Sequence, residues 1–382
     1  MRFYRVLFLC LGLLGSTLPA RAQFIEKVKA PLQKMFGDST TAPGEPKLVG
    51  YPTLAYAPET RWEFGASLLY VYHAQRKPEN RLSEISTFAF VTLEQQYGLW
   101  LDHALYTDEN RWYFLGRVRA QSFPLRYHGI GTEAPAEYQA YVAANQIWWR
   151  ERILRRVGND NWFVGLDADV QSLWNVDFQW QPEATNLLLP LGNGGSFNMG
   201  LGPSIVYDNR ENVLNVRHGL YAVASGLIYH PALGSEFNFS QFFTEVRGFV
   251  PVNERQVFAA QAQAVFNNGD VPFNQLALMG GESLMRGYYL GRYRDRQMLA
   301  AQVEYRWLPF DLPFTDRIGA AVFIGAGTVA PTVSDLINVP WQISGGGGLR
   351  VLIFPDKDIY TRLDVGFTRE GPGYYLYIGE AF

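Results

Sequence analysis

Residues 256–266 read QVFAAQAQAVF, and their side chains alternate between two chemical kinds. From residue 258 onward one parity is entirely apolar: Phe258, Ala260, Ala262, Ala264 and Phe266. Gln261 and Gln263 have the other parity. A period of two sustained over nine or more residues is the pattern of a β-strand with two different faces. The stretch therefore predicts a strand that is apolar on one side and polar on the other.

The same alternation returns in segments far apart in the chain. Residues 162–174 set Leu166, Ala168 and Val170 against Asp167, Asp169 and Gln171. Residues 359–367 set Ile359, Leu363, Val365 and Phe367 against Tyr360, Arg362 and Asp364. Such segments run to about ten to fifteen residues, longer than the five or six typical of soluble sheets and long enough for a tilted strand to cross a bilayer. Aromatic residues near segment ends fit an interfacial girdle: Trp148, Trp149, Tyr288, Tyr289, Trp307, Tyr374 and Tyr375.

From residue 48 to residue 382 the chain holds about sixteen alternating segments, an even number as bacterial barrels have. The composition is 48% hydrophobic and 15% aromatic, yet no stretch after residue 22 has the roughly 20 consecutive apolar residues of a spanning helix. A closed barrel leaves no unpaired backbone in hydrocarbon. We therefore predict an all-β fold, a transmembrane antiparallel β-barrel of about 16 strands over residues 48–382. A large soluble β-protein is the alternative.

The first 22 residues begin with two arginines among the first five positions, continue with an apolar run and end in small residues around a third arginine, the pattern of a cleaved secretory signal. Cys10, the only cysteine, lies inside this segment. Without the three arginines of the signal, 30 Lys and Arg remain against 36 Asp and Glu, so nothing points to a nucleic-acid partner. Residues 23–47 carry Pro, Gly and Lys and predict a short linker.

One loop departs from the alternation, residues 280–297, GGESLMRGYYLGRYRDRQ. A turn at residues 267–270 ends the strand before it, so about 28 residues separate two strands, and loops this long usually have a function. The next strand, residues 297–307, places Glu304 on its polar face. Because arginine and carboxylate match as a hydrogen-bonding fork, we expect the loop to fold into the lumen and contact Glu304. Small residues of the following strand would leave room for it: Gly319, Ala321, Gly325 and Gly327.

The segment MRGYY at residues 285–289 resembles the motif at the tip of the long lumenal loop of the Omp85 superfamily. These are the outer-membrane insertases and two-partner secretion transporters, also called the bacterial surface antigen family. Three further segments resemble the family in the same order: RYHGIG at 126–131, YDNRENVLNVRHGLY at 207–221 and SGGGGLRVLIFPDKDIYTRLDVGF at 344–367. The resemblance is strongest over residues 202–382.

This resemblance implies roles for individual residues. Arg286, Gly287 and Tyr288 match the loop-tip motif, and Glu304 matches its acidic partner on the next strand. Gly325 stands where family members commonly have an aspartate, so Asp364 and Asp358 are alternative second anchors.

Phe382 resembles the terminal aromatic residue that outer-membrane assembly machinery reads, and it shares a parity with Tyr374, Leu376 and Ile378. The family usually carries periplasmic POTRA domains. Residues 23–47 are too few for one, so we expect none there.

The functional hypothesis is insertion or translocation of proteins or lipids at the outer membrane of a Gram-negative bacterium. The route would be a seam between the first strand, residues 48–57, and a last strand weakened by Gly371, Gly373 and Gly379. Lipid, the assembly machinery and periplasmic or outer-membrane proteins are the expected partners. The alternatives are a gated pore with the loop as plug, and an accessory barrel that depends on a partner.

A hydrolase is disfavoured as a function. Ser283 lacks the final glycine of G-x-S-x-G, and the five histidines show no metal-ligand spacing. Asp167 and Asp169 could form an acid pair, although charged lumens are ordinary in barrels. We expect no catalytic residue, no metal and no cofactor.

Overall fold

The structure is a computed structural model that describes residues 45–158, 161–184, 188–210, 215–312, 315–354 and 358–382. The predicted signal and almost all of the predicted linker therefore lie outside the described residues. Within the described part, no helix has the length and apolar character needed to cross a membrane.

Sixteen long strands form the barrel wall: β1 (Lys47–Ala57), β2 (Arg61–His73), β3 (Leu82–Thr92), β4 (Tyr97–Tyr106), β5 (Trp112–Ser122), β7 (Ala140–Val157), β8 (Trp162–Trp180), β9 (Ser196–Asp208), β10 (Gly219–Tyr229), β11 (Phe239–Asn253), β12 (Gln256–Gly269), β15 (Gln297–Trp307), β16 (Ile318–Ala330), β17 (Gln342–Phe354), β18 (Ile359–Thr368) and β19 (Gly371–Ile378). The shorter elements are β6 (Leu125–Tyr127), β13 (Ala277–Met279), β14 (Tyr293–Asp295) and the 3-10 turns η1 (Ala74–Arg76), η2 (Asp108–Asn110), η3 (Pro231–Leu233) and η4 (Ser334–Ile337).

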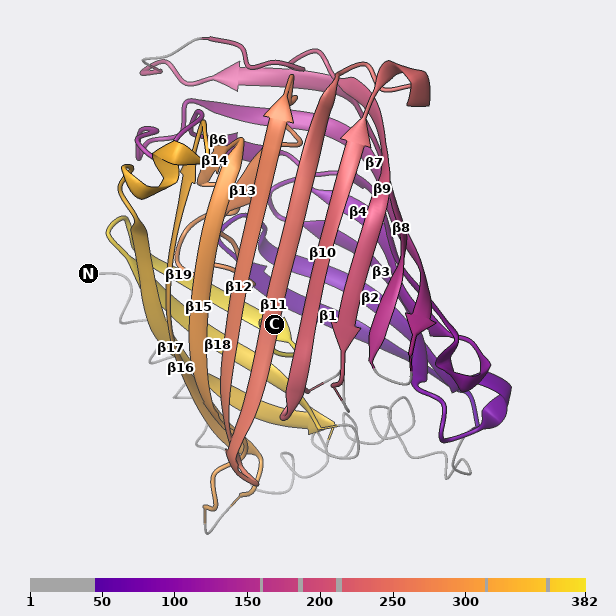
Figure 1. The fold of residues 1–382 in the computed structure, drawn as a ribbon. Helices are drawn as coiled ribbons and strands as arrows, with labels where there is room; N and C mark the ends of the chain where they lie inside the picture. Colours follow the sequence, from indigo (N-terminus) through magenta and orange to yellow (C-terminus); the bar gives the residue numbers. More distant parts are fainter. Residues whose placement is uncertain (1–44, 159–160, 185–187, 211–214, 313–314, 355–357) are drawn as a thin grey trace, which may run out of the picture.

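Each wall strand pairs antiparallel with the next, and β1 returns to pair with β19 (Figure 1). The predicted fold class and strand number are confirmed. We call the end of the barrel where β1 begins and β19 ends the terminal end, and the opposite end the loop end. The short β6 continues from β5 and pairs with β7 at the loop end.

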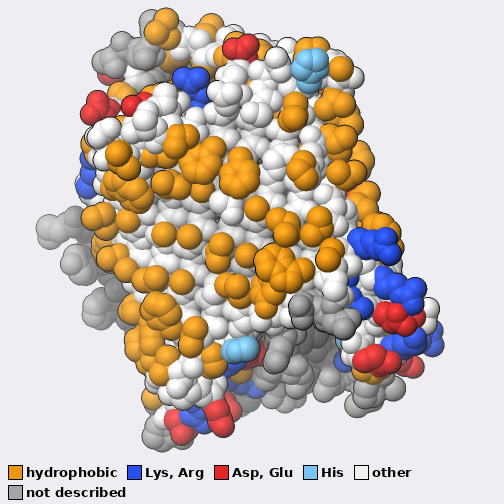
Figure 2. Space-filling model, viewed as in Figure 1, with side chains coloured by type: hydrophobic (Ala, Val, Ile, Leu, Met, Phe, Trp, Pro, Cys, Tyr) orange, Lys and Arg blue, Asp and Glu red, His pale blue; other side chains and the backbone are white. Residues whose placement is uncertain are grey.

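The two faces of the wall follow the alternation of the sequence. Phe258 on β12 is 41% exposed on the outside, whereas Gln261 is 4% exposed on the inside. Asp167 and Asp169 of β8 are likewise buried in the interior. Leu166, the residue before Asp167, points to the outer face and is exposed. Figure 2 shows apolar side chains across the middle of the outer face and charged groups gathered at its ends. A barrel with lipid outside and polar residues inside has this distribution.

The girdle prediction is wrong for four aromatic residues. Trp148 points inward, where its indole N–H donates to Asp169 Oδ1 at 2.6 Å. Tyr288 and Tyr289 lie in the lumenal loop, and Tyr375 is 0% exposed on the inner face of β19. Trp149 and Tyr374, the sequence neighbours of Trp148 and Tyr375, are 46% and 52% exposed on the outer face. Adjacent residues of a strand point to opposite sides, so an aromatic pair can supply at most one girdle residue.

A polar pair interrupts the apolar outer face. His103 on β4 pairs in register with Gly116 on β5, and Gly116 with Glu151 on β7. The His103 ring Nε2 lies 3.0 Å from Glu151 Oε1. A Cβ on Gly116 would lie 2.2 Å from Glu151 Oε2, so the missing side chain lets the two residues meet across β5. Each polar group thereby gains a partner in a region where an unpaired charge is costly.

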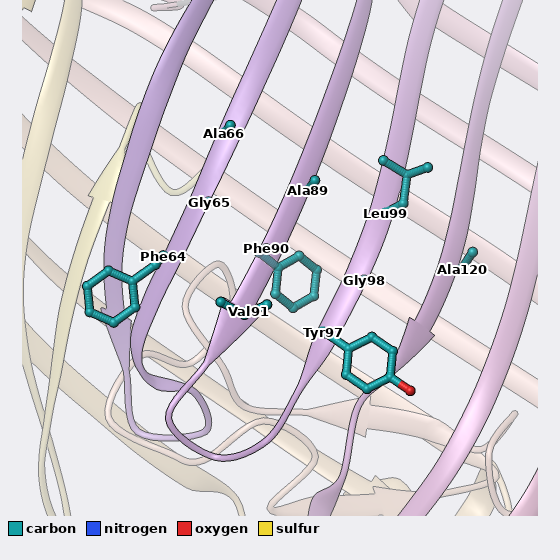
Figure 3. A pocket seen from close by; sticks show the side chains of 10 residues that line it. All are labelled: Phe64, Gly65, Ala66, Ala89, Phe90, Val91, Tyr97, Gly98, Leu99 and Ala120. Carbon is teal, nitrogen blue, oxygen red and sulfur yellow. The ribbon is translucent and has the colours of Figure 1, made fainter.

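An apolar groove of about 490 Å³ lies on the outer face of β2 to β5 (Figure 3). Small side chains form part of it, namely Ala66, Ala89 and Ala120. Its lining has no titratable side chain except the Tyr97 phenol. The groove is therefore part of the lipid-facing surface and is separate from the charged interior.

The long loop between β12 and β15 folds into the barrel, as expected from the sequence. Its first part carries Phe273 and Leu276 into a buried cluster with inner residues of β7 to β11. The hairpin β13–β14 and the tip pack Met279 and Met285 into a second cluster that includes Met298 of β15. The loop thus crosses the interior and contacts opposite parts of the wall.

Candidate functional site

Arg286, at the tip of the lumenal loop, has an exposed fraction of 0%. Its guanidinium donates through Nη1 to Asp364 Oδ2 at 2.6 Å and through Nη2 to Glu304 Oε2. Its Cζ also stands 3.6 Å from the centroid of the Phe323 ring. One arginine therefore meets two carboxylates and one aromatic face, the contacts that suit a planar, delocalised cation.

These contacts belong to a larger network on the inner wall. Four arginines face four carboxylates: Arg286, Arg306, Arg350 and Arg362 face Glu282, Glu304, Asp364 and Glu380. Arg350 bridges β17 to β18 and to the segment after β19, with Asp364 at 2.5 Å and Glu380 at 2.8 Å. Equal numbers of opposite charges, all buried except the partly exposed Glu282, avoid the cost of an unpaired buried ion. We call these eight residues the charge network.

Glycines of two neighbouring strands make the space for this network. A Cβ on Gly348 of β17 would lie 2.1 Å from Asp364 Oδ1, and one on Gly346 would lie 2.8 Å from Phe323 Cζ. On β18, a Cβ at Gly366 would lie 2.5 Å from the Arg286 carbonyl oxygen. The glycine-rich part of the 344–367 motif therefore lets the loop tip lie directly on the wall.

The rest of the loop-tip motif contacts β19 and β17. Gly287 has a φ of +112°, a left-handed conformation that favours glycine, and its N–H donates to Tyr375 Oη at 2.8 Å. The Tyr375 hydroxyl donates in turn to the Tyr288 carbonyl at 3.2 Å. Tyr288 donates its own hydroxyl to the Ile343 carbonyl at 3.3 Å.

Asp364 occupies the role for which the sequence left two alternatives. Gly325 supplies no carboxylate, and the space a side chain would need is taken by Met285, whose Sδ would lie 3.2 Å from the added Cβ. Asp358, the other alternative, pairs with Arg217 at 2.8 Å near the terminal end instead. The second acidic contact of Arg286 is therefore Asp364 of β18.

Phe382 lies beyond the last strand and does not continue its alternation, whereas its role as an assembly signal stays a prediction. β19 ends at Ile378, and Gly379 turns the chain inward with a φ of +91°. Phe382 is 9% exposed inside the barrel, where its ring lies 5.2 Å from Arg306 Cζ and 6.2 Å from the Phe249 ring. The salt bridges of Glu380 hold this inward turn, and a parity count cannot detect them.

The segment 126–131 contacts the lumenal loop at the loop end. Gly131 N–H donates to the Arg294 carbonyl at 2.9 Å, and the Arg126 guanidinium stacks 5.2 Å from the Tyr289 ring. The segment 207–221 instead lies at the terminal end, where Arg210 pairs with Asp208 at 2.9 Å. The loop-tip segment therefore contacts both 126–131 and 344–367, and the segment 207–221 contacts 344–367 through Arg217 and Asp358.

The remaining sequence candidates have structural partners. Asp167 pairs with Arg150 at 2.7 Å and Arg152 at 3.0 Å. Asp169 accepts from the Tyr229 hydroxyl at 2.8 Å. Ser283 is exposed at the loop tip. Over the described ranges, no group of three or more His, Cys, Asp or Glu residues is arranged to hold a metal ion.

The junction between the first and last strands is the weakest in the wall. β1 and β19 have one pair of residues in register, Tyr56 with Leu376. By contrast, all eleven residues of β1 pair with β2, and all eight of β19 pair with β18. We call the β1–β19 junction the seam. Because few ladder hydrogen bonds cross it, separating these two strands costs less than separating any other pair of wall strands.

The Omp85 superfamily domain matches residues 106–352 of the chain. The chain belongs to the Omp85 superfamily. The match covers more than half of the sequence and includes the lumenal loop, Glu304 and the Gly325 position. This Omp85 barrel is an integral protein of the outer membrane of Gram-negative bacteria. A comparison with curated proteins gives no match.

Solved structures of two kinds share the fold. BamA from Haemophilus ducreyi lacking POTRA domains 1–3 has a TM-score of 0.55 and 16% identity, over 88% of this chain and 70% of that one. CdiB from Escherichia coli has a TM-score of 0.59 and 11% identity over 89% of this chain. CdiB from Acinetobacter baumannii has a TM-score of 0.56 and 10% identity over 87%. The Omp85 barrel spans 64% and 59% of these two CdiB chains.

Several residues of the site escaped the sequence analysis. Arg350 and Glu380 belong to the charge network, and Phe323 stacks on Arg286 of that network. The parity of β16 and β17 places Phe323 and Arg350 on the inner face, so alternation could have found both. Glu380 carries no such signal, because it lies beyond the last strand. Its role depends on the inward turn at Gly379.

The buried carboxyl of Glu59, in the turn between β1 and β2, should make the stability of the barrel depend on pH. Its side chain is 4% exposed, and its Oε2 has no hydrogen-bond partner among the described residues. Burial raises the pKa of the Glu59 carboxyl to about 8, and the nearby Glu282 charge acts in the same direction. The folded state therefore holds a proton that the unfolded state releases near its ordinary pKa of about 4.3.

Stability should consequently fall as the pH rises from about 4.3 to 8, by on the order of 2–4 kcal/mol from this residue. The measurement is the urea midpoint in detergent micelles at pH 5, 7 and 9. Glu59→Gln is expected to remove most of the fall, since it keeps the shape without an ionisable proton. An equal fall in wild type and variant would assign the pH dependence to other groups.

Proposed function

We propose that this Omp85 barrel inserts or translocates proteins at the outer membrane, with the seam as the lateral exit. The single registered pair between β1 and β19 is the observation that carries the proposal. Hydrophobic segments can pass from the interior to lipid only where strands separate, and this junction has the fewest hydrogen bonds to break. Membership of a superfamily of insertases and secretion transporters supports the same function.

A lock on the seam tests the exit route. Tyr56 and Leu376 face outward and are register partners, so Tyr56→Cys with Leu376→Cys can form a disulfide across the seam. The assay is insertion of an unfolded outer-membrane β-barrel protein into liposomes that contain the Omp85 barrel, read as resistance to protease. Oxidation of the seam pair is expected to abolish insertion, and a reductant should restore it.

A matched disulfide controls for the chemistry. Leu54 and Phe64 are outward-facing register partners on β1 and β2, and their junction is fully paired. Leu54→Cys with Phe64→Cys should therefore cross-link without loss of insertion. Insertion that persists with the seam locked would eliminate the lateral exit.

A gated pore is the second candidate function, because the lumenal loop lies across the interior and could serve as a plug. Conductance in a planar bilayer separates the two functions. A large steady current that Arg286→Ala leaves unchanged would favour an open pore and speak against the loop as a plug. We also propose that the barrel is not an enzyme and that transported or outer-membrane proteins are its partners.

A further inference from the structure

Three ion pairs attach the lumenal loop to the last hairpin of the barrel. Arg286 pairs with Asp364 of β18 at 2.6 Å, and Arg292 pairs with Glu370 in the β18–β19 turn at 2.8 Å. Arg362 of β18 pairs with Glu282 of the loop. These contacts come from three points along eleven residues of the loop. The hairpin they hold contains β19, which is one side of the seam.

Tyr375 makes the contact between the loop tip and the seam strand itself. It lies on the inner face of β19 with an exposed fraction of 0%. Its hydroxyl oxygen accepts the Gly287 N–H at 2.8 Å, and its hydroxyl proton goes to the Tyr288 carbonyl at 3.2 Å. One hydroxyl thus satisfies a backbone donor and a backbone acceptor of the loop tip. The Tyr288 carbonyl is buried and the Gly287 N–H is partly buried, so losing the shared hydroxyl is costly.

The backbones of the loop and β19 approach each other closely at this point. A Cβ on Gly373 would lie 3.0 Å from Gly287 Cα and 3.1 Å from the Gly287 carbonyl oxygen. The Tyr375 hydroxyl lies at the same place, 3.0 Å from that added Cβ. A glycine at residue 373 therefore allows direct contact between the tip and the strand, and Tyr375 supplies its hydrogen bonds.

β19 has little else to hold it on the seam side. Leu376, the residue after Tyr375, forms the one registered pair with β1. The position of β19 is thus set by β18 on one edge, by the loop on its inner face and by a single pair on the other edge. A change in the loop contact should accordingly alter the seam more than any other junction.

We propose that Tyr375 is a positioning residue that couples seating of the lumenal loop to closure of the seam. With the loop seated, its hydroxyl holds β19 beside β1; with the loop released, β19 loses that restraint and the seam separates more readily. This inference deepens the proposed function and rests on it for the use of the seam as an exit. Coupling between two sites is reciprocal, so a closed seam must also favour a seated loop.

The rate of trypsin cleavage in the lumenal loop of the full-length barrel measures how closure of the seam affects seating of the loop. Arg286 and Arg292 are 0% and 1% exposed, so trypsin can cut there only after the loop leaves the wall. Cleavage then follows the population of the released loop. The background carries Tyr56→Cys with Leu376→Cys, so that the seam is either locked by oxidation or free after reduction. Fragment masses identify cleavage at these two arginines.

With Tyr375 present, locking the seam is expected to slow cleavage at Arg286 and Arg292 severalfold. Tyr375→Phe keeps the ring and removes the hydroxyl, which leaves the Gly287 N–H and Tyr288 carbonyl unpaired. We expect cleavage about tenfold faster in this variant, with little remaining effect of the seam lock. Tyr374→Phe is the matched control, because Tyr374 is 52% exposed on the outer face, and it should behave as wild type.

A second experiment measures how seating of the loop affects closure of the seam, through the rate of disulfide formation by the seam pair. Arg286→Lys loosens the loop tip without touching β19 and is expected to slow disulfide formation by the seam pair. This arm is independent of the folding of Tyr375→Phe. Wild-type cleavage and an intact seam effect in Tyr375→Phe, or seam cross-linking unaffected by Arg286→Lys, would overturn the proposal. Loss of insertion with the seam locked tests the proposed function separately, since neither arm measures insertion.

Discussion

Replacing Arg286 with alanine is expected to lower the free energy of unfolding of the barrel by about 3 kcal/mol. The guanidinium is fully buried and bonded to Asp364 and Glu304, and it stacks on Phe323. Its removal leaves the charge network with an excess of one buried negative charge and deprives the loop tip of its contacts with β15 and β18. The midpoint of urea or thermal unfolding in detergent micelles measures the loss.

The same variant should also raise conductance in planar bilayers, because the loop tip is no longer held against the wall. Arg286→Lys retains the charge but not the two-pronged fork, so an intermediate stability is expected. Arg296→Ala is the matched control, since Arg296 lies in the same segment and its side chain is exposed. A stability equal to wild type in Arg286→Ala would refute the anchor role of this residue.

Gly366→Ala is expected to displace the loop tip from the wall with no change of charge. The added Cβ would lie 2.5 Å from the Arg286 carbonyl oxygen, 2.6 Å from its carbonyl carbon and 2.7 Å from Gly287 N. All three are backbone atoms that cannot rotate away, so either the loop or β18 must move. Overpacking of this kind costs about 1–3 kcal/mol. Faster trypsin cleavage at Arg286 and Arg292 would report the displaced loop.

Gly345→Ala provides a nearby comparison. Gly345 pairs with Phe367 on the neighbouring strand, and its added Cβ would come no closer than 3.5 Å to another atom, an ordinary contact. This variant should match wild type in unfolding midpoint and loop cleavage. If Gly366→Ala also matches wild type, the tip does not rest on β18 in the membrane.

The alternation of the sequence predicted most of the wall. The parity of Gln261 and Asp167 was enough to predict that they face the interior, because apolar side chains face the lipid and polar side chains face the lumen. The lumenal position of the loop and the wall position of Glu304 were predictable for a related reason. Clustered arginines cannot face hydrocarbon, and the next strand offered a carboxylate on its inner face.

Contacts between distant strands were not predictable by parity. Asp358 and Asp364 lie close together in the sequence, so the sequence could not choose between them as the partner of Arg286. In the closed barrel Asp364 lies beside Arg286, whereas Asp358 pairs with Arg217. Parity predicted that Phe382 continues the last strand. The hydrogen bonding of β19 ends at Ile378, however, and alternation does not apply beyond that residue. Glu380 draws this segment inward through Arg350, a residue of β17 that the sequence separates from it by 30 positions.

The sequence by itself determined that this protein is a barrel with lipid outside, a polar lumen and a charged loop inside, because period-two alternation and the cost of buried charge are local properties. Only the tertiary structure decided that Asp364 is the second carboxylate bound to Arg286, where Phe382 lies and that the seam has a single registered pair. Those features arise from strand register and closure, which bring residues together across the barrel whatever their distance in the chain.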